Sequence, residues 1–347
     1  MNYERRSPEK PVLVILAAGL GRRYGGLKPL APIGARGEAI IDLSVRDAME
    51  AGFESVLMVV RAEIEATLEY HVKRCWPADL HVELVRQDSP AGAPTAGASG
   101  PAVASSAPRG TAQAVLATRA AVSAPFGVVN ADDLYGAASY QLLYDHLSAA
   151  GSDKVATSSS SGRGANSGAG TFGGQEAPSH ALVGFRLRST IVGQGPVKRA
   201  TCEQSPEGYL TAITEQTITA RGDGTFLASN DRATVELTGD ELVSVNMWGF
   251  LPSIFPVLQE AFDQFLEDQG DQGANDTNEL LLPDVVGAMV SKPDAERVRI
   301  LASTGRCIGV THGADLAAVR EQVEDLVAKG IIPDPLWAGA RRAWAAP

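Results

Sequence analysis

The N-terminal part of the chain alternates short apolar runs with longer segments whose apolar residues recur at helical spacing. Apolar or alternating runs predict strands at Val12–Leu16, Phe53–Val60 and His81–Arg86. The intervening segments, Ile40–Ala51 and Glu63–Cys75, have the spacing of amphipathic helices. A strand, helix, strand rhythm is typical of parallel strands joined by crossover helices. The pattern therefore predicts an α/β fold of three layers with a mixed, mostly parallel central sheet.

The same two patterns continue through the rest of the chain. They predict further strands at Leu182–Leu187, Val197–Glu203, Tyr209–Glu215 and Leu242–Phe250, and a last strand pair at Val298–Leu301 and Cys307–Thr311. They predict a helix that starts within Arg109–Leu116, with Thr111 as its N-cap. Further helices are predicted at Ser139–Ala150, Phe255–Leu266, Asp284–Val290 and Asp315–Lys329. Segments 90–107 and 158–179 are rich in Pro, Ala, Gly and Ser, so we expect disordered insertions in a single domain spanning 1–347.

Composition narrows the class of protein. The 347 residues are 44% hydrophobic and 20% charged, as in an ordinary globular protein, and the net charge of −11 argues against a general nucleic-acid binder. The cysteines Cys75, Cys202 and Cys307 lack metal-type spacing, which favours a reduced protein without structural zinc. The first apolar run is followed by cations rather than by a cleavage region, and no run is long enough to span a membrane. We expect a cytoplasmic protein with no membrane partner.

The loop after the first predicted strand combines glycines with positive charge. It contains Gly19, Gly21, Gly25 and Gly26 together with Arg22, Arg23 and Lys28. Backbone N–H groups freed of side chains can close on an anion, so the loop predicts a phosphate site. Tyr24 stands where the dinucleotide fingerprint needs its third glycine, and Leu27 stands where an ATPase-type P-loop needs its lysine. Both common phosphate motifs are therefore excluded.

A second stretch, Phe126–Gly136, carries an apolar strand into two adjacent carboxylates, Asp132 and Asp133. In open parallel sheets, ligands bind outside the carboxyl ends of the strands. Mg²⁺ is usually held there by one or two carboxylates together with phosphate oxygens. Neighbouring residues of an extended strand point to opposite sides, so we expect Asp132 to hold the metal and Asp133 to support it or to cap a helix.

The loop resembles the signature of nucleotidyltransferases that join an NTP to a sugar 1-phosphate, Leu-Ala-Ala-Gly-x-Gly-x-Arg followed by Lys-Pro. Arg22 stands where that family usually has Ser or Thr. The resemblance implies a Rossmann-like (GT-A-like) fold, Mg²⁺ as cofactor, and catalytic roles for Arg23, Lys28 and Asp132. It also implies nucleotide binding by Leu16, Ala17, Ala18, Gly19, Gly21, Arg22, Gly110 and Gln113.

The acceptor half of the family pattern is matched less closely. Glu215 matches the family's Glu-Lys-Pro, but Gln216 and Thr217 replace the Lys-Pro, so Lys198 or Arg199 is expected to supply the missing cation. The resemblance further implies substrate binding by Asn246, Gly249 and Glu279. The second metal aspartate of many relatives falls at Gly309, which leaves Asp132 alone with phosphates and water, or with Asp315 as helper. For Asp315, a helix cap is the favoured role, ahead of metal binding.

The sequence thus predicts Mg²⁺-dependent transfer of a nucleotide from an NTP to a phosphorylated small molecule, in the first place a sugar 1-phosphate, with release of pyrophosphate. Alternatives are transfer to a non-sugar phosphate such as a phosphocholine-like acceptor, a metal-dependent glycosyltransferase, and a non-catalytic regulatory subunit that binds a nucleotide-sugar. The base, the sugar and the possible formation of a homo-oligomer are not fixed by the sequence.

Overall fold

The computed structural model describes residues 10–19, 27–87, 109–158, 177–193, 195–230, 233–272, 279–310 and 313–337. In this part of the chain one 12-stranded sheet runs through the molecule, and β5 (Asp133–Leu134) and β14 (Ile308–Gly309) form a separate antiparallel pair. The large sheet has the order β10 (Thr234–Leu237), β9 (Phe226–Ser229), β8 (Leu210–Ala220), β7 (Val197–Gln204), β11 (Leu242–Ser244), β6 (His180–Arg186), β12 (Trp248–Phe250), β4 (Phe126–Asn130), β1 (Val12–Leu16), β2 (Ser55–Val60) and β3 (His81–Arg86), with β13 (Val298–Ser303) also paired to β6.

The N-terminal strands form a parallel block. Strands β3, β2, β1 and β4 pair in parallel, and the register sets Leu16 beside both Val59 and Asn130. The predicted α/β fold with a mixed sheet is thereby confirmed. Strands β6 and β13 also pair in parallel, but the other pairings of the C-terminal half are antiparallel. The sheet is therefore mostly parallel in its N-terminal block only.

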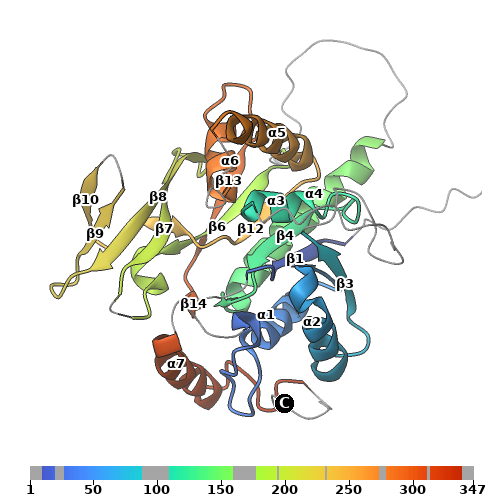
Figure 1. The fold of residues 1–347 in the computed structure, drawn as a ribbon, viewed down its shortest axis with the longest axis vertical. Coiled ribbons are helices and arrows are strands. Elements are labelled where there is room, and N and C mark those ends of the chain that lie inside the picture. The colour runs from blue at the N-terminus through green and yellow to red at the C-terminus, as the bar shows by residue number, and fades with distance from the viewer. Residues whose placement is uncertain are drawn as a thin grey trace, which may run out of the picture.

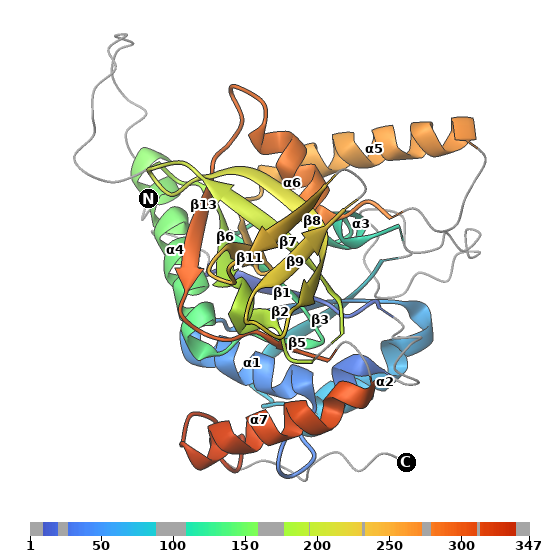
Figure 2. The ribbon, with the colours of Figure 1, turned by 90° about the vertical axis from the view of Figure 1, so that its left-hand side faces the viewer.

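Helices cover both faces of the sheet (Figures 1 and 2). A hydrophobic core lies on each face of the sheet, and alternate residues of β1 point into one or the other. Leu13 and Ile15 face the core shared with α1 (Ile40–Ala51), α2 (Ala62–Cys75) and α4 (Ala137–Ser158). Val14 faces the other core, shared with α3 (Thr111–Leu116), α5 (Ile254–Gln272) and α6 (Leu282–Val290). Helix α7 (Leu316–Ala328) packs on α1 through a third core. Short 3₁₀ turns lie at Lys28–Leu30, Leu187–Thr190 and Gly313–Asp315.

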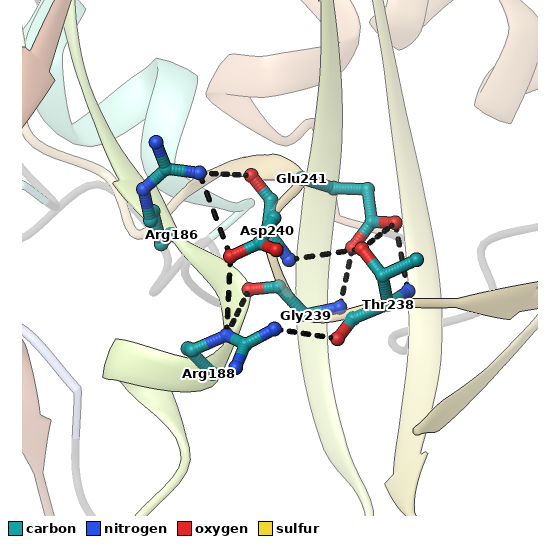
Figure 3. Close-up of polar contacts among 6 residues, drawn as sticks. All are labelled: Arg186, Arg188, Thr238, Gly239, Asp240 and Glu241. Carbon is teal, nitrogen blue, oxygen red and sulfur yellow. Dashed lines mark hydrogen bonds and ion pairs between the residues drawn. The ribbon is translucent and has the colours of Figure 1, made fainter. Parts of the chain in front are cut away.

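Strands β8, β9 and β10 extend the sheet beyond the parallel block (Figure 1). Two arginines hold the turn from β10 to β11. Arg186, the last residue of β6, donates to the carbonyl of Asp240 at 3.0 Å, and Arg188, just after β6, donates to that of Thr238 at 2.9 Å (Figure 3). The Glu241 carboxylate closes the turn by accepting from the backbone of Thr238 and Gly239. These exposed contacts fix the turn's geometry and contribute little free energy.

The last strands depart from the sequence prediction. The predicted strand Leu242–Phe250 is split into β11 and β12, because Asn246 has a left-handed φ of 61° that breaks the extended backbone. The predicted pairing of 298–301 with 307–311 is wrong: β13 pairs with β6, and β14 pairs with β5. The predicted insertions at 90–107 and 158–179 lie outside the described residues, except for Ser158 and residues 177–179.

Candidate active site

The carboxyl ends of β1 and β4 meet at one edge of the sheet. The N–H of Ala131 donates to the carbonyl of Leu16 at 3.2 Å, and the N–H of Ala17 donates to that of Val59 at 2.9 Å. Ala17 and Ala18 are buried, whereas a Cβ added at Gly19 would meet no described atom within 4 Å. The first part of the predicted phosphate loop therefore leaves the sheet at Gly19 without packing against any other described segment there. Its predicted residues Gly21, Arg22 and Arg23 lie outside the described residues.

Lys28 and Asp132, distant in sequence, are brought together beside these strand ends. The Lys28 Nζ lies 3.6 Å from Asp132 Oδ2, with 18% and 34% of the two side chains exposed. Burial raises the pKa of the Asp132 carboxyl, and the Lys28 ammonium opposes that rise. From the solvent side, the partly exposed carboxylate can bind a metal ion and the neighbouring ammonium can bind a phosphate. This pair is the centre of the candidate site.

Asp133 begins β5, whereas Asp132 lies in the preceding turn. Because Asp132 is outside the strand, the alternation expected of extended residues does not apply to this pair. Asn130 Nδ2 donates to Asp133 Oδ2 at 2.9 Å, and the Ser44 hydroxyl donates to the Asp133 carbonyl at 2.8 Å. Burial and the neighbouring Asp132 charge raise the pKa of Asp133 to about 6, and Arg199 opposes the rise.

A buried tyrosine links the end of β4 to the loop between β11 and β12. The Tyr135 hydroxyl accepts from the N–H of Asn130 at 3.0 Å and donates to the carbonyl of Val245 at 3.0 Å. Asn246 follows directly, and its Oδ1 accepts from Trp248 Nε1 at 3.3 Å. The predicted substrate residue Asn246 is therefore on a loop tied to the site.

Gly249 is buried in the sheet, and its lack of a side chain is used in packing. A Cβ there would lie 2.9 Å from Leu143 and 3.2 Å from Leu147 of α4. Gly249 therefore allows α4 to approach β12 closely.

The predicted base-binding residues form a second group with the segment before α6. Gly110 has φ 101°, and a Cβ on it would lie 2.3 Å from the Leu280 carbonyl oxygen. The Gln113 Oε1 accepts from the backbone of Arg109 at 2.8 Å. Leu280 pairs with the backbone on both sides of Gly110, which brings its exposed neighbour Glu279 to the start of α3.

Thr111 does not cap helix α3. Gly110 is the N-cap residue of this helix, and no side chain makes a capping hydrogen bond there. The Thr111 hydroxyl instead accepts from the N–H of Leu282 at 2.8 Å. The predicted cap is thus wrong. The Thr111 hydroxyl oxygen accepts from the first residue of α6 and not from the N–H groups at the start of α3.

Lys198 and Glu215 lie on neighbouring strands, 3.3 Å apart from Nζ to Oε1. Burial and the Glu215 charge raise the pKa of Asp284 at the start of α6, and Lys198 opposes the rise. Arg199 differs from Lys198, since its guanidinium donates to the hydroxyl and carbonyl of Thr190 and to the Lys198 carbonyl. Of the two predicted cations, Lys198 forms an ion pair with Glu215, whereas Arg199 acts on the charge of Asp133.

Asp315 and Gly309 line one hollow together with Arg199. Asp315 is the N-cap residue of α7, but its side chain makes no capping hydrogen bond, so the predicted capping interaction is wrong. The backbone around Asp315 is already helical, which directs the side chain away from the first N–H groups of the helix. Its part in metal binding stays a prediction.

The donor set fits Mg²⁺ in the form that the resemblance implies. Asp132 and Asp133 offer hard oxygen ligands, and Mg²⁺ needs only one or two carboxylates where phosphates and water complete its shell. Among the described residues no group of three or more His, Cys, Asp or Glu side chains is placed to hold a metal ion. A metal bound here would thus depend on the nucleotide for part of its coordination.

Residues 13–171 match the model of the MobA-like NTP transferase domain. The resemblance predicted from Leu16–Pro29 is thereby confirmed, and the match supports a nucleotidyltransferase. The match contains Lys28, Asp132 and the end of β1, the residues that the fold gathers. No curated protein matches the chain.

Solved structures with similar folds extend over most of the chain. The inositol-1-phosphate CTP transferase of T. maritima has a TM-score of 0.55 at 12% identity, covering 92% of this chain and 96% of its own. A UDP-glucose pyrophosphorylase complexed with UDP-glucose has a TM-score of 0.52 at 16% identity, covering 91% and 99%. The UDP-glucose pyrophosphorylase from Acinetobacter baumanii has a TM-score of 0.50 at 17% identity, covering 92% and 99%. At these identities the likeness shows a similar fold over most of the chain, including its C-terminal half.

Three residues of the site region were missed or undervalued by the sequence reasoning. Asn130 and Tyr135 orient Asp133 and the 245–246 loop, and Asp284 joins the Lys198 cluster. Asn130 could have been found from its place three residues before Asp133, a common turn spacing. Asp284 gave no signal, because an acid in the first turn of a helix is ordinary.

None of the described helices is long and apolar enough to cross a membrane.

Proposed function

We propose that this nucleotidyltransferase condenses an NTP with a sugar 1-phosphate to give an NDP-sugar and pyrophosphate. The observation that carries the proposal is the Lys28–Asp132 pair, 3.6 Å apart at the carboxyl ends of β1 and β4 inside the NTP transferase domain. A cation and a carboxylate at this edge suit phosphate groups and their metal. Two structural neighbours are pyrophosphorylases for UDP-glucose, and a third uses CTP and inositol 1-phosphate.

In the proposed reaction an oxygen of the acceptor phosphate attacks the α-phosphorus of the NTP in line. A new P–O bond forms, the bond between the α-phosphorus and the bridging oxygen breaks, and the electron pair leaves with pyrophosphate. No covalent intermediate with the protein is needed, so catalysis consists of positioning and charge stabilisation. Lys28 neutralises charge at the α-phosphate, and Arg23, which lies outside the described residues, is assigned to the leaving pyrophosphate.

Asp132 is assigned to Mg²⁺, with the phosphate oxygens and water as further ligands. When bound, the metal supplies neutralisation of charge on the phosphates. Lys28 also favours the ionised form of Asp132, because the nearby ammonium opposes the rise of its pKa that burial causes. The same pair can thus hold the carboxylate ready and release it to the metal when phosphates compete for Lys28.

The acceptor is assigned to the C-terminal half of the sheet. Lys198, beside Glu215, supplies the cation that Gln216 and Thr217 do not, and its side chain is 76% exposed. Asn246 and Glu279 are assigned to acceptor hydroxyls. A phosphorylated polyol with several hydroxyls would use these groups, whereas a phosphocholine-like acceptor would leave them unpaired.

The test is pyrophosphate release over a matrix of NTPs and sugar 1-phosphates, inositol 1-phosphate and phosphocholine, with Mg²⁺ and with EDTA. We expect one Mg²⁺-dependent pair to be turned over well. Lys28→Met and Asp132→Asn should each lower kcat by about 100-fold or more, because each removes a charge that acts in the transition state. Lys329→Met, in an exposed ion pair at the end of α7, is the matched control and should leave kcat unchanged.

A matrix with activity only on phosphocholine would replace the sugar acceptor by the non-sugar alternative. A matrix without any activity, combined with thermal stabilisation by an NTP, would favour the regulatory subunit. Full activity of Lys28→Met would contradict the role of the central pair.

A further inference from the structure

A cavity of about 590 Å³ is lined by the last turns of α2, the connection to β3, and β3 itself. Its lining includes Val82 of β3, Trp76 and Trp337, and Cys75, which is the last residue of α2. A cavity of this size accommodates a small organic molecule. None of the described residues that we assign to nucleotidyl transfer lines this cavity, so a group bound in it is independent of the proposed function.

Cys75 is one of three polar side chains that contact one another in sequence. His71 lies one helical turn before it on α2, and residues four apart share a helix face. His71 Nε2 lies 2.6 Å from Asp42 Oδ1. The Asp42 carboxylate is itself held by the indole N–H of Trp76 at 2.7 Å and the backbone N–H of Ala39 at 2.8 Å. Thiol, imidazole and carboxylate in this order are an arrangement by which proteins activate a nucleophile.

The charge of His71 determines what the thiol can do. Burial lowers the pKa of His71, but Asp42 and Cys75 raise it to about 9, so the imidazole is protonated at neutral pH. With Asp42 at Nε2, Nδ1 is the nitrogen that serves Cys75. A positive charge beside a thiol favours the thiolate, which is the nucleophilic form. Lys73 and Arg74 in the last turn add positive charge, which offsets the negative end of the helix dipole.

The other two cysteines are in different surroundings. Cys202 is half-buried like Cys75, but burial raises its pKa to about 12, and its thiol donates to the Ala200 carbonyl at 3.5 Å. Cys307 is buried, and burial raises its pKa well above the usual range. A buried thiol of this kind stays protonated and unreactive. The three cysteines should therefore differ strongly in reactivity.

We propose that Cys75 is a modification site, at which its thiolate takes up a low-molecular-weight thiol by exchange with the corresponding disulfide. The Cys75 sulfur attacks one sulfur of the disulfide, a new S–S bond forms, and the original S–S bond breaks with its electron pair on the leaving sulfur. Cys75 is thereby oxidised, and the leaving half of the disulfide is reduced to a thiolate that takes a proton from water. The group attached to Cys75 occupies the cavity.

The test treats the reduced chain with oxidised glutathione at pH 7 and follows each cysteine by mass spectrometry of its peptides. We expect Cys75 to be modified at least about 5-fold faster than Cys202 or Cys307, and at least about 5-fold faster than Cys75 of the urea-unfolded chain. Cys202→Ser is the matched control and should leave the rate at Cys75 unchanged. Equal rates at Cys75 and Cys202, or no acceleration over the unfolded chain, would overturn the proposal.

Two variants test the activating charge and the cavity separately, with melting temperatures to report folding. His71→Gln keeps a polar side chain without the charge, so the rate at Cys75 should fall about 5-fold. Val82→Trp fills the cavity from the edge strand, so it should slow oxidised glutathione at least about 5-fold and leave the much smaller iodoacetamide unaffected.

A folded His71→Gln variant with the wild-type rate would overturn the activation of Cys75. If that variant does not fold, the comparison of the three wild-type cysteines decides the same point. Equal effects of Val82→Trp on both reagents would overturn the placement of the attached group in the cavity.

Discussion

A buried ion pair between α1 and α2 should give the protein a stability that falls as the pH rises from about 6.5 to 9. His71 Nε2 lies 2.6 Å from Asp42 Oδ1, which also accepts from Trp76 Nε1 at 2.7 Å, and Oδ2 accepts from the N–H of Ala39 at 2.8 Å. The His71 side chain is fully buried. Burial lowers the pKa of His71, but Asp42 and the Cys75 thiol outweigh it and raise that pKa to about 9.

The magnitude follows from the shift. One pKa unit corresponds to about 1.4 kcal/mol, so a rise from 6.5 to about 9 makes the protonated folded state more stable by about 3 kcal/mol. Since the pKa is raised on folding, this stability is fully present below pH 6.5 and is lost as the pH rises through the folded value. Asp47 and Asp133, whose pKa values are raised to about 6, change the unfolding free energy below this pH window. Cys202, whose pKa is raised to about 12, changes it above the window.

The assay is urea unfolding at half-unit pH steps from 6 to 9.5, followed by tryptophan fluorescence. Wild type should lose about 3 kcal/mol of unfolding free energy over this range. Asp42→Asn should be destabilised by about 3 to 5 kcal/mol at pH 6 and should show little of this pH dependence, because the partner charge is gone. Asp325→Asn, in an exposed ion pair, is the control and should change stability by under about 1 kcal/mol. Equal slopes in wild type and Asp42→Asn would refute the reasoning.

Three further predictions concern the site. Gly110→Ala should lower the melting temperature more than Gly136→Ala, because both have positive φ but only the first would meet the Leu280 carbonyl, at 2.3 Å; equal effects would contradict this packing. Asn246→Gly should raise the acceptor KM while changing the unfolding free energy by about 1 kcal/mol or less, since glycine accepts the φ of 61°. Lys198→Met should raise the acceptor KM about 10-fold and leave the NTP KM unchanged in steady-state kinetics; an unchanged acceptor KM would remove Lys198 from the acceptor site.

The parallel block could be predicted because its elements carry two independent signals. Helix α1 has both apolar spacing and a glycine stop, and its bounds Ile40–Ala51 match the prediction at both ends, as do those of β1 and β3. Strand β10 shows why the antiparallel half was harder. Thr234, Val235 and Glu236 are all exposed, so no alternation marks the strand, and only its pairing with β9 makes it one.

The candidate site divides in the same way. Lys28 and Asp132 could be predicted from the sequence, because their residue types and motif spacing indicate phosphate and metal binding. The contact between Asp133 and Gly309 depends on the pairing of two short strands far apart in the sequence, and the predicted partner of the last strand was a different one. The position of Lys198 beside Glu215 likewise depends on the register of β7 with β8.

This division has a consequence for substrate choice. The residues that we propose for the phosphate chemistry lie in the segment 13–171 that matches the NTP transferase model. The residues proposed for the acceptor lie in the C-terminal half: Lys198, Glu215, Asn246 and Glu279. Strands β7 and β8, which carry Lys198 and Glu215, are separated from β4 and β1 by β11, β6 and β12 in the order of the sheet. We therefore expect variants of the C-terminal half to alter the acceptor KM, and variants of the strand ends to alter kcat for every acceptor. A variant at Lys198 that lowered kcat equally for all acceptors would show that the two halves do not act separately.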